Sequence, residues 1–134
     1  MATLKIISGR FTIDIYKGDD EDILLDSFRD SENNPLNLAS LYTNARFQVR
    51  QFPRSGKAIV TKTLGDGISF VADSDGNANA AVLISLPKEE TAELIEGTLS
   101  ADFEWTLSDG TVQTMETEEG NQHWIVNIKS DVTR

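Results

Sequence analysis

The sequence predicts an all-β domain, an antiparallel β-sandwich that is Ig-like in general plan. Large apolar residues alternate with polar ones over short runs, and a period of two gives each strand one buried face. Turn-forming Gly, Asp and Asn residues separate the runs at intervals of about 8–12 residues, which is typical of sandwiches and barrels. One segment, residues 87–96, departs from the alternation and predicts a short helix.

The runs before this helix predict most of the strands. Phe11, Ile13 and Ile15 share one face of the first strand. Pro53 ends the third strand because proline has no N–H for the ladder. One helical turn is predicted within residues 36–41. The strands are predicted at residues 11–16, 22–28, 45–52, 58–62, 68–71 and 80–86.

The helical segment at residues 87–96 carries signals at both ends. Pro87 stands at its start, acidic residues follow in the first turn, and Gly97 comes directly after it. These are the positions that proline, acids and glycine favour around a helix. A helix this short is unstable alone, so we expect Leu94 and Ile95 to dock it against the sheet.

The last third of the chain predicts a β-hairpin and a final strand. Residues 103–107 and 111–115 both alternate, and the Asp-Gly pair between them tolerates the positive φ of a tight turn. The final strand is predicted over residues 123–129 and closes on residues 131–134. The alternation predicts these core residues: Phe103, Trp105, Leu107, Val126 and Ile128.

Composition restricts the classes of partner. The 134 residues suit one domain, residues 1–134, with a core that needs no covalent staple. A net charge of −10 repels phosphate backbones, so we expect no nucleic-acid partner. The chain has no cysteine, no apolar run of about 18 residues, and no apolar leader after Met1. We therefore expect no disulfide and no membrane contact.

Motifs for catalysis or metal binding are nearly missing. Residues 73–79 look like a calcium loop, but they lack its turn glycine and its bidentate glutamate, so a hairpin turn explains them better. His123 is the single histidine, which is too few for a zinc site, and no nucleophile motif accompanies it. Glu116, Glu118 and Glu119 fit a mobile loop better than a glycosidase carboxylate pair. We predict no enzyme activity, no catalytic residue, no cofactor and no metal.

The two tryptophans leave an alternative function open. Trp105 lies between Phe103 and Leu107 on the inward face, and Trp124 shares the parity of Val126, so both are predicted in the core. An exposed tryptophan would instead offer a flat surface for a sugar ring. The alternative is therefore a carbohydrate-binding module or adhesin-like domain with Trp124 as the glycan contact.

Residues 1–8 allow two interpretations. Leu4, Ile6 and Ile7 are apolar and need cover. As an N-terminal arm, the segment would bind a partner by pairing with the edge of that partner's sheet. Otherwise it is the first strand of the chain's own sandwich.

Several short motifs together resemble a known family. They are the Lys17-Gly18-Asp19 turn, Asn34-Pro35-Leu36-Asn37-Leu38, residues 103–107, the hairpin at 109–114 and the closing residues 131–134. In this order they are similar to small β-sandwich structural proteins of tailed bacteriophages, and in particular to the N-terminal domain of phage baseplate upper proteins. The resemblance implies a virion protein, made in the host cytoplasm and placed in a tail, baseplate, fibre adaptor or neck. Its implied partners are other virion proteins and symmetric copies of itself.

Overall fold

The computed structural model describes residues 2–7, 9–52 and 57–130, and these form eleven strands and two single-turn helices. The all-β fold class is confirmed. The helices are α1 (Leu38–Leu41) and α2 (Lys88–Thr91). The strands are β1 (Ala2–Thr3), β2 (Lys5–Ile7), β3 (Arg10–Tyr16), β4 (Glu21–Leu25), β5 (Tyr42–Arg50), β6 (Val60–Leu64), β7 (Gly67–Val71), β8 (Ala81–Leu86), β9 (Gly97–Leu107), β10 (Val112–Thr114) and β11 (Trp124–Lys129).

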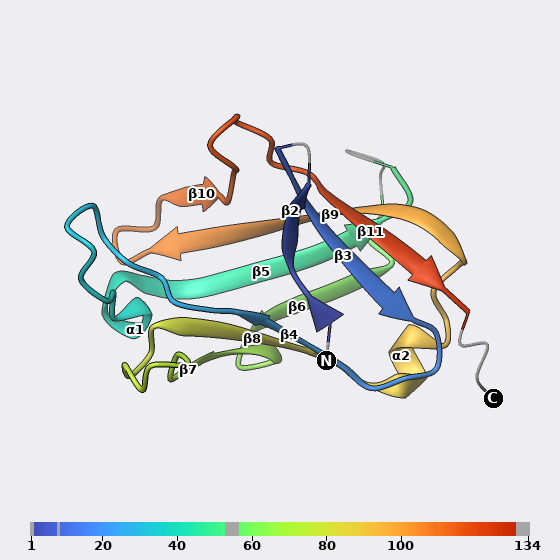
Figure 1. Cartoon of the computed structure of the whole chain (residues 1–134), viewed down its shortest axis with the longest axis horizontal. Coiled ribbons are helices and arrows are strands. Elements are labelled where there is room, and N and C mark those ends of the chain that lie inside the picture. The colour runs from blue at the N-terminus through green and yellow to red at the C-terminus, as the bar shows by residue number, and fades with distance from the viewer. Residues whose placement is uncertain (1, 8, 53–56, 131–134) are drawn as a thin grey trace.

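The strands belong to one sheet that curls on itself (Figure 1). Their order is β1-β4-β8-β7-β6-β5-β9-β11-β3-β2, and β10 pairs with β9 beside this path. The sheet is mixed rather than purely antiparallel, because β1 runs parallel to β4, β7 to β6 and β11 to β3. The partners in β1–β4 and in β3–β11 are distant in the chain, which leaves room for the crossover that parallel pairing needs. β6 and β7 are joined by Gly65 and Asp66 alone, and their parallel pairing covers two residues on each strand.

The N-terminal segment joins the two ends of the curled sheet. β1 pairs with β4 at one end of the strand order, and β2 pairs with β3 at the other. Leu4, between these two strands, packs against the core. Residues 2–7 are therefore strands of the chain's own sheet, as the second of the two interpretations predicted.

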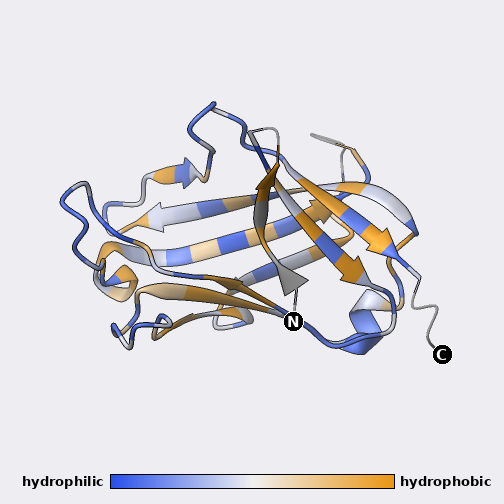
Figure 2. Ribbon diagram, in the orientation of Figure 1, coloured by the Kyte–Doolittle hydropathy of each residue, from blue (hydrophilic) through white to orange (hydrophobic). Residues whose placement is uncertain are grey.

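Apolar side chains fill the space between the layers. Orange and blue segments alternate along β3, β5 and β11 in Figure 2, which is the period of two that the sequence predicted. Of the five predicted core residues, Phe103, Trp105, Val126 and Ile128 are buried. Leu107 is half-buried instead, because it is the last residue of β9 and lies beside an irregularity in the β5 register.

The predicted helix at residues 87–96 is too long. Only α2 is helical, and tertiary contacts hold it against the turn between β3 and β4. The Thr91 hydroxyl donates to the Asp19 carbonyl at 2.7 Å and accepts from the Gly18 N–H at 3.1 Å. Leu94 is buried, but the chain turns away after it. Ile95 is therefore 60% exposed and, contrary to the prediction, does not dock the segment. Gly97 begins β9 rather than capping a helix.

Other boundaries differ by a few residues. The strand predicted at 22–28 ends at Leu25, and Ser27 takes a φ of 62°, which breaks extended structure. The Asp-Gly hairpin forms as predicted, with the Leu107 N–H donating to the Thr111 carbonyl at 2.8 Å. The turn predicted at residues 53–56 and the closing strand at 131–134 lie outside the described residues.

Candidate binding surface

The segment between β10 and β11 separates two cavities. Met115 and Glu116 line both of them. The segment was predicted to be a mobile loop, but side-chain hydrogen bonds fix it to the turn between β2 and β3. The Thr117 hydroxyl donates to the Gly9 carbonyl at 2.7 Å, and the Asn121 amide donates to the same oxygen at 2.9 Å. Both cavities therefore have one wall in a defined position.

The first cavity, which we call the apolar groove, has a volume of about 520 Å³. It lies where β2 and β4, from opposite ends of the curled sheet, come together. Two acidic residues, Asp26 and Glu116, line it, and among the residues whose side chains the structure describes no basic residue does. Its apolar lining consists of Leu4, Ile6, Phe11, Leu24, Leu25, Phe28 and Met115.

Ile6 is the unusual residue of this groove. It pairs with Phe11 across β2 and β3, so both side chains lie on the same face of the sheet. Phe11 is buried on that face, whereas Ile6 is 62% exposed. A core-facing isoleucine is therefore left open to solvent. Ile7, on the opposite face, is 53% exposed, so the structure leaves two of the three predicted partner-binding residues uncovered.

The second cavity, which we call the amide pocket, has a volume of about 530 Å³ and a polar lining. Gln113 pairs with Trp105 across β10 and β9, so its side chain lies on the inward face of the hairpin. Tyr42 stacks on Trp105 with ring centroids 4.4 Å apart and forms an aromatic wall. Thr114, Glu116 and Gln122 complete the polar part of the lining.

Sequence reasoning missed both cavities. The groove depends on how β2 and β4, from opposite ends of the strand order, come together, and no local sequence pattern determines this. The amide pocket had a signal, since the register of the predicted hairpin places a glutamine, Gln113, opposite the core residue Trp105. A polar residue at an inward position marks a place where the core is open.

Trp124 is not a glycan contact. It is 1% exposed, and its ring packs against Phe11, Phe47 and Phe103. A ring surrounded in this way has no free face for a sugar. The specific residue proposed for the carbohydrate alternative is therefore wrong, and the core assignment of Trp124 is confirmed.

The other candidate residues form no reactive cluster. The Asp73 carboxylate accepts from the N–H groups of Asp75 and Asn77 at 3.0 and 2.8 Å and so holds a tight turn. The hydrogen bond from the Asn77 side chain contributes most to lowering the pKa of Asp73, and these backbone hydrogen bonds lower it further. Within the part of the chain that the structure describes, no three His, Asp or Glu residues come close enough to hold a metal ion.

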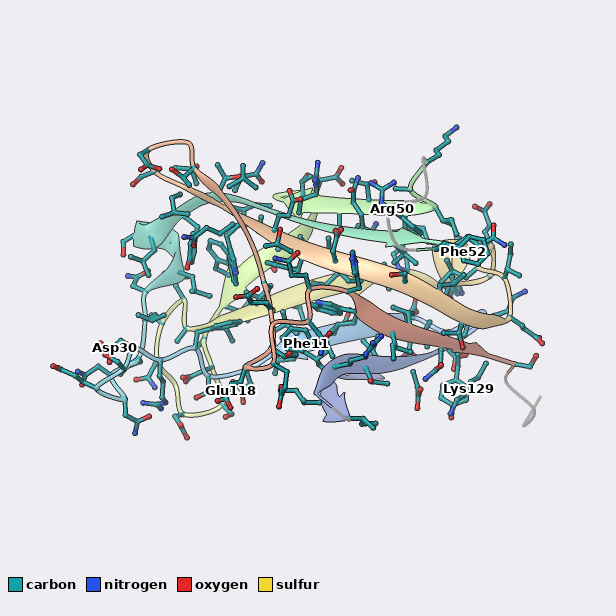
Figure 3. All side chains as sticks on the ribbon, turned by 90° about the horizontal axis from the view of Figure 1, so that it is seen from above. Phe11, Asp30, Arg50, Phe52, Glu118 and Lys129 are labelled. Carbon is teal, nitrogen blue, oxygen red and sulfur yellow. The ribbon has the colours of Figure 1, made fainter. Side chains whose placement is uncertain are left out.

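Asp102 is a half-buried carboxylate on the outer face of β9. Arg46 and Glu104 form an ion pair beside it, at 2.6 Å. Burial, and then the charge of Glu104, raise the pKa of the Asp102 carboxyl, while Arg50 and Arg46 oppose the shift. Its Oδ1 atom is buried and has no hydrogen-bond partner among the described residues. Figure 3 shows Arg50 at the end of the sheet opposite to Asp30.

We expect Asp102→Asn to stabilise the domain at neutral pH. Because the folded-state pKa of Asp102 is raised, the native state binds its proton more tightly than the unfolded state does. Stability is therefore lost as the pH rises from the ordinary carboxyl pKa through the raised one. Calorimetry should show a higher Tm for the variant at pH ~7 and no such gain at about pH 3, where both states are protonated. An equal gain at both pH values would contradict this explanation.

Comparison with known proteins gives no family. No protein-family model and no curated protein matches the chain. Among solved structures, CopC from Methylosinus trichosporium OB3b is 13% identical, with a TM-score of 0.40 over 98% of this chain and 99% of that one. AggA, the major subunit of aggregative adherence fimbriae type I from Escherichia coli, is 13% identical, with a TM-score of 0.24 over 84% of this chain and 97% of that one. Neither is a phage baseplate protein, so the resemblance to that family stays a prediction.

Among the described residues, no helix has the length and apolar character needed to cross a membrane.

Proposed function

We propose that this chain is a non-catalytic assembly domain that binds an apolar segment of another protein in the apolar groove. One observation carries the proposal: Ile6 faces the core side of the sheet and is nevertheless 62% exposed. Fully burying such a side chain contributes about 1.5–3 kcal/mol, so an apolar partner gains by covering it.

The charges around the groove define the partner further. Asp26 and Glu116 line it, and no basic side chain that the structure describes offsets them. The whole chain carries a net charge of −10, which disfavours a second copy as the occupant. The complementary occupant is an apolar segment flanked by Lys or Arg, from a different protein.

The backbone of β2 offers a further means of binding. β2 stands at the end of the strand order and pairs with β3 alone among the described strands. An extended segment can add to such an edge through main-chain hydrogen bonds while its side chains fill neighbouring pockets. The occupant is therefore proposed to bind as a strand.

The resemblance to tailed-phage structural proteins supplies the setting of this proposal. In a tail, baseplate, neck or fibre adaptor, the groove would hold a segment of a neighbouring virion protein. Symmetric copies of the chain would then be arranged by that neighbour around the particle axis. Under this proposal the protein would be a component of the virion, after synthesis in the host cytoplasm.

We expect Ile6→Asp to reduce incorporation into phage particles about tenfold or more, because the apolar contact is lost and a carboxylate would have to be desolvated against the apolar segment. The folded state should be little affected, since Ile6 is exposed. The measurement is quantitative mass spectrometry of purified particles assembled with either variant. Val112→Asp is the matched control, because Val112 is 56% exposed on an edge strand away from the groove.

Two outcomes would contradict different parts of the proposal. Absence of the wild-type protein from purified particles would remove the phage setting. Equal incorporation of the wild type and Ile6→Asp would show that the groove is not the contact.

A further inference from the structure

The amide pocket is separate in chemistry from the apolar groove. Its polar lining consists of two amides, one hydroxyl and one carboxylate, contributed by Gln113, Gln122, Thr114 and Glu116. Within the described part of the chain, no Lys, Arg or His lines it. A phosphate, sulfate or sialic acid would therefore meet no compensating charge. A single carboxylate is also too little for a metal ion.

We propose that the amide pocket binds a neutral saccharide. Amides both donate and accept hydrogen bonds, so Gln113 and Gln122 suit the hydroxyl groups of a sugar, which do the same. Tyr42, stacked on Trp105, adds an aromatic wall for the apolar C–H face of a sugar ring. A volume of about 530 Å³ lies within the range of small-ligand sites.

The pocket is held in shape before a ligand enters. Trp105 is 6% exposed and anchors the aromatic wall, and edge-on contact with Phe103 fixes its ring. The opposite wall follows Met115 and Glu116 into the segment that Thr117 and Asn121 fix to Gly9. Gln122 already donates a long hydrogen bond to Glu116 across this wall, at 3.4 Å. Walls fixed in this way lower the entropy cost of binding.

This site replaces Trp124 as the basis of a carbohydrate function. The aromatic residue now involved is Tyr42, and the hydrogen-bonding groups come from β10 and the segment after it. The inference does not depend on the assembly role, because Gln113 and Gln122 do not line the apolar groove.

A glycan array with neutral, sialylated and sulfated glycans tests the specificity, and calorimetric titration with the best neutral glycan tests the site. We expect binding to neutral glycans alone. Gln113→Ala and Gln122→Ala should each weaken it about five- to tenfold, the effect of one lost neutral hydrogen bond. Both glutamines are exposed, so an unchanged Tm should accompany the loss.

Val112→Ala is the matched control, since this residue neighbours Gln113 on β10 and does not line the pocket. It should leave affinity unchanged. Absence of neutral glycan binding, binding confined to anionic glycans, or binding that survives both glutamine substitutions would each overturn the proposal. Ile6→Asp lies outside the pocket, so its effect on particle incorporation is a separate result.

Discussion

Replacing Trp105 with alanine is expected to lower the free energy of unfolding by about 3–5 kcal/mol. The indole contacts four aromatic rings, with centroid distances of 4.4 Å to Tyr42, 4.7 Å to Phe103, 5.5 Å to Phe28 and 6.3 Å to Phe70. Trp105 lies in β9 and Phe70 in β7, which are not neighbours in the strand order, so Trp105 connects separate parts of the curled sheet. Removing the indole leaves a cavity among these rings. Because sheet hydrogen bonds fix the strands that surround the cavity, the structure has little scope to collapse into it.

Thermal and denaturant unfolding both measure this effect. A loss of this size in a domain of 134 residues corresponds to a fall in Tm of about 10 °C or more. Val112→Ala serves as the control because Val112 is exposed and should cost little. A Trp105→Ala variant that melts with the wild type would mean that this ring is not part of the core.

Patterns in the sequence correctly predicted those turns and strands whose structure depends on neighbouring residues alone. The Asp109-Gly110 turn forms because its backbone requirement is met by neighbouring residues, and the alternation of β5 and β9 fixes which side chains are buried. The helix at 87–96 was predicted too long because its end is decided by distant contacts. Thr91 bonds to residues more than seventy positions away, and no window of sequence contains both partners.

The candidate sites were less accessible to prediction than the fold. Leu4, Ile6 and Ile7 were identified as apolar and in need of cover, and two of them are indeed exposed. The groove beside them was not predictable, because it arises where β2 and β4 meet after the sheet has curled. Trp124 was offered as a glycan contact from residue type alone, and its parity with Val126 was the better guide to its position.

Lys62 shows that an inward-facing charge can be part of the fold. It pairs with the buried Phe47 across β6 and β5, so it lies on the core face. Its ammonium Nζ lies 2.7 and 2.6 Å from the two carboxylate oxygens of Glu90 in α2. The Lys62 side chain is 10% exposed and that of Glu90 39%, so the lysine depends on its partner more than the glutamate does. The stem of Lys62 also lies against Gly67, where an added Cβ would approach it to 2.4 Å.

Glu90→Gln is therefore expected to destabilise the domain by about 2–4 kcal/mol, because it leaves the Lys62 ammonium buried without a carboxylate. The lower half of this range allows for the partial exposure of Glu90. The double variant Lys62→Met with Glu90→Gln should recover most of the loss, since an apolar side chain of similar length removes the buried charge. Glu89→Gln, on the same helical turn but exposed, should cost little.

Denaturant unfolding of the wild type, the single variants and the double variant gives the coupling energy directly. Additive losses from Lys62→Met and Glu90→Gln would show that the two side chains do not depend on each other. Strong coupling would instead show that the ion pair, together with the Thr91 hydrogen bonds, holds α2 over the end of the sandwich. These contacts explain why a four-residue helix persists at Lys88–Thr91 although a helix of this length has little stability of its own.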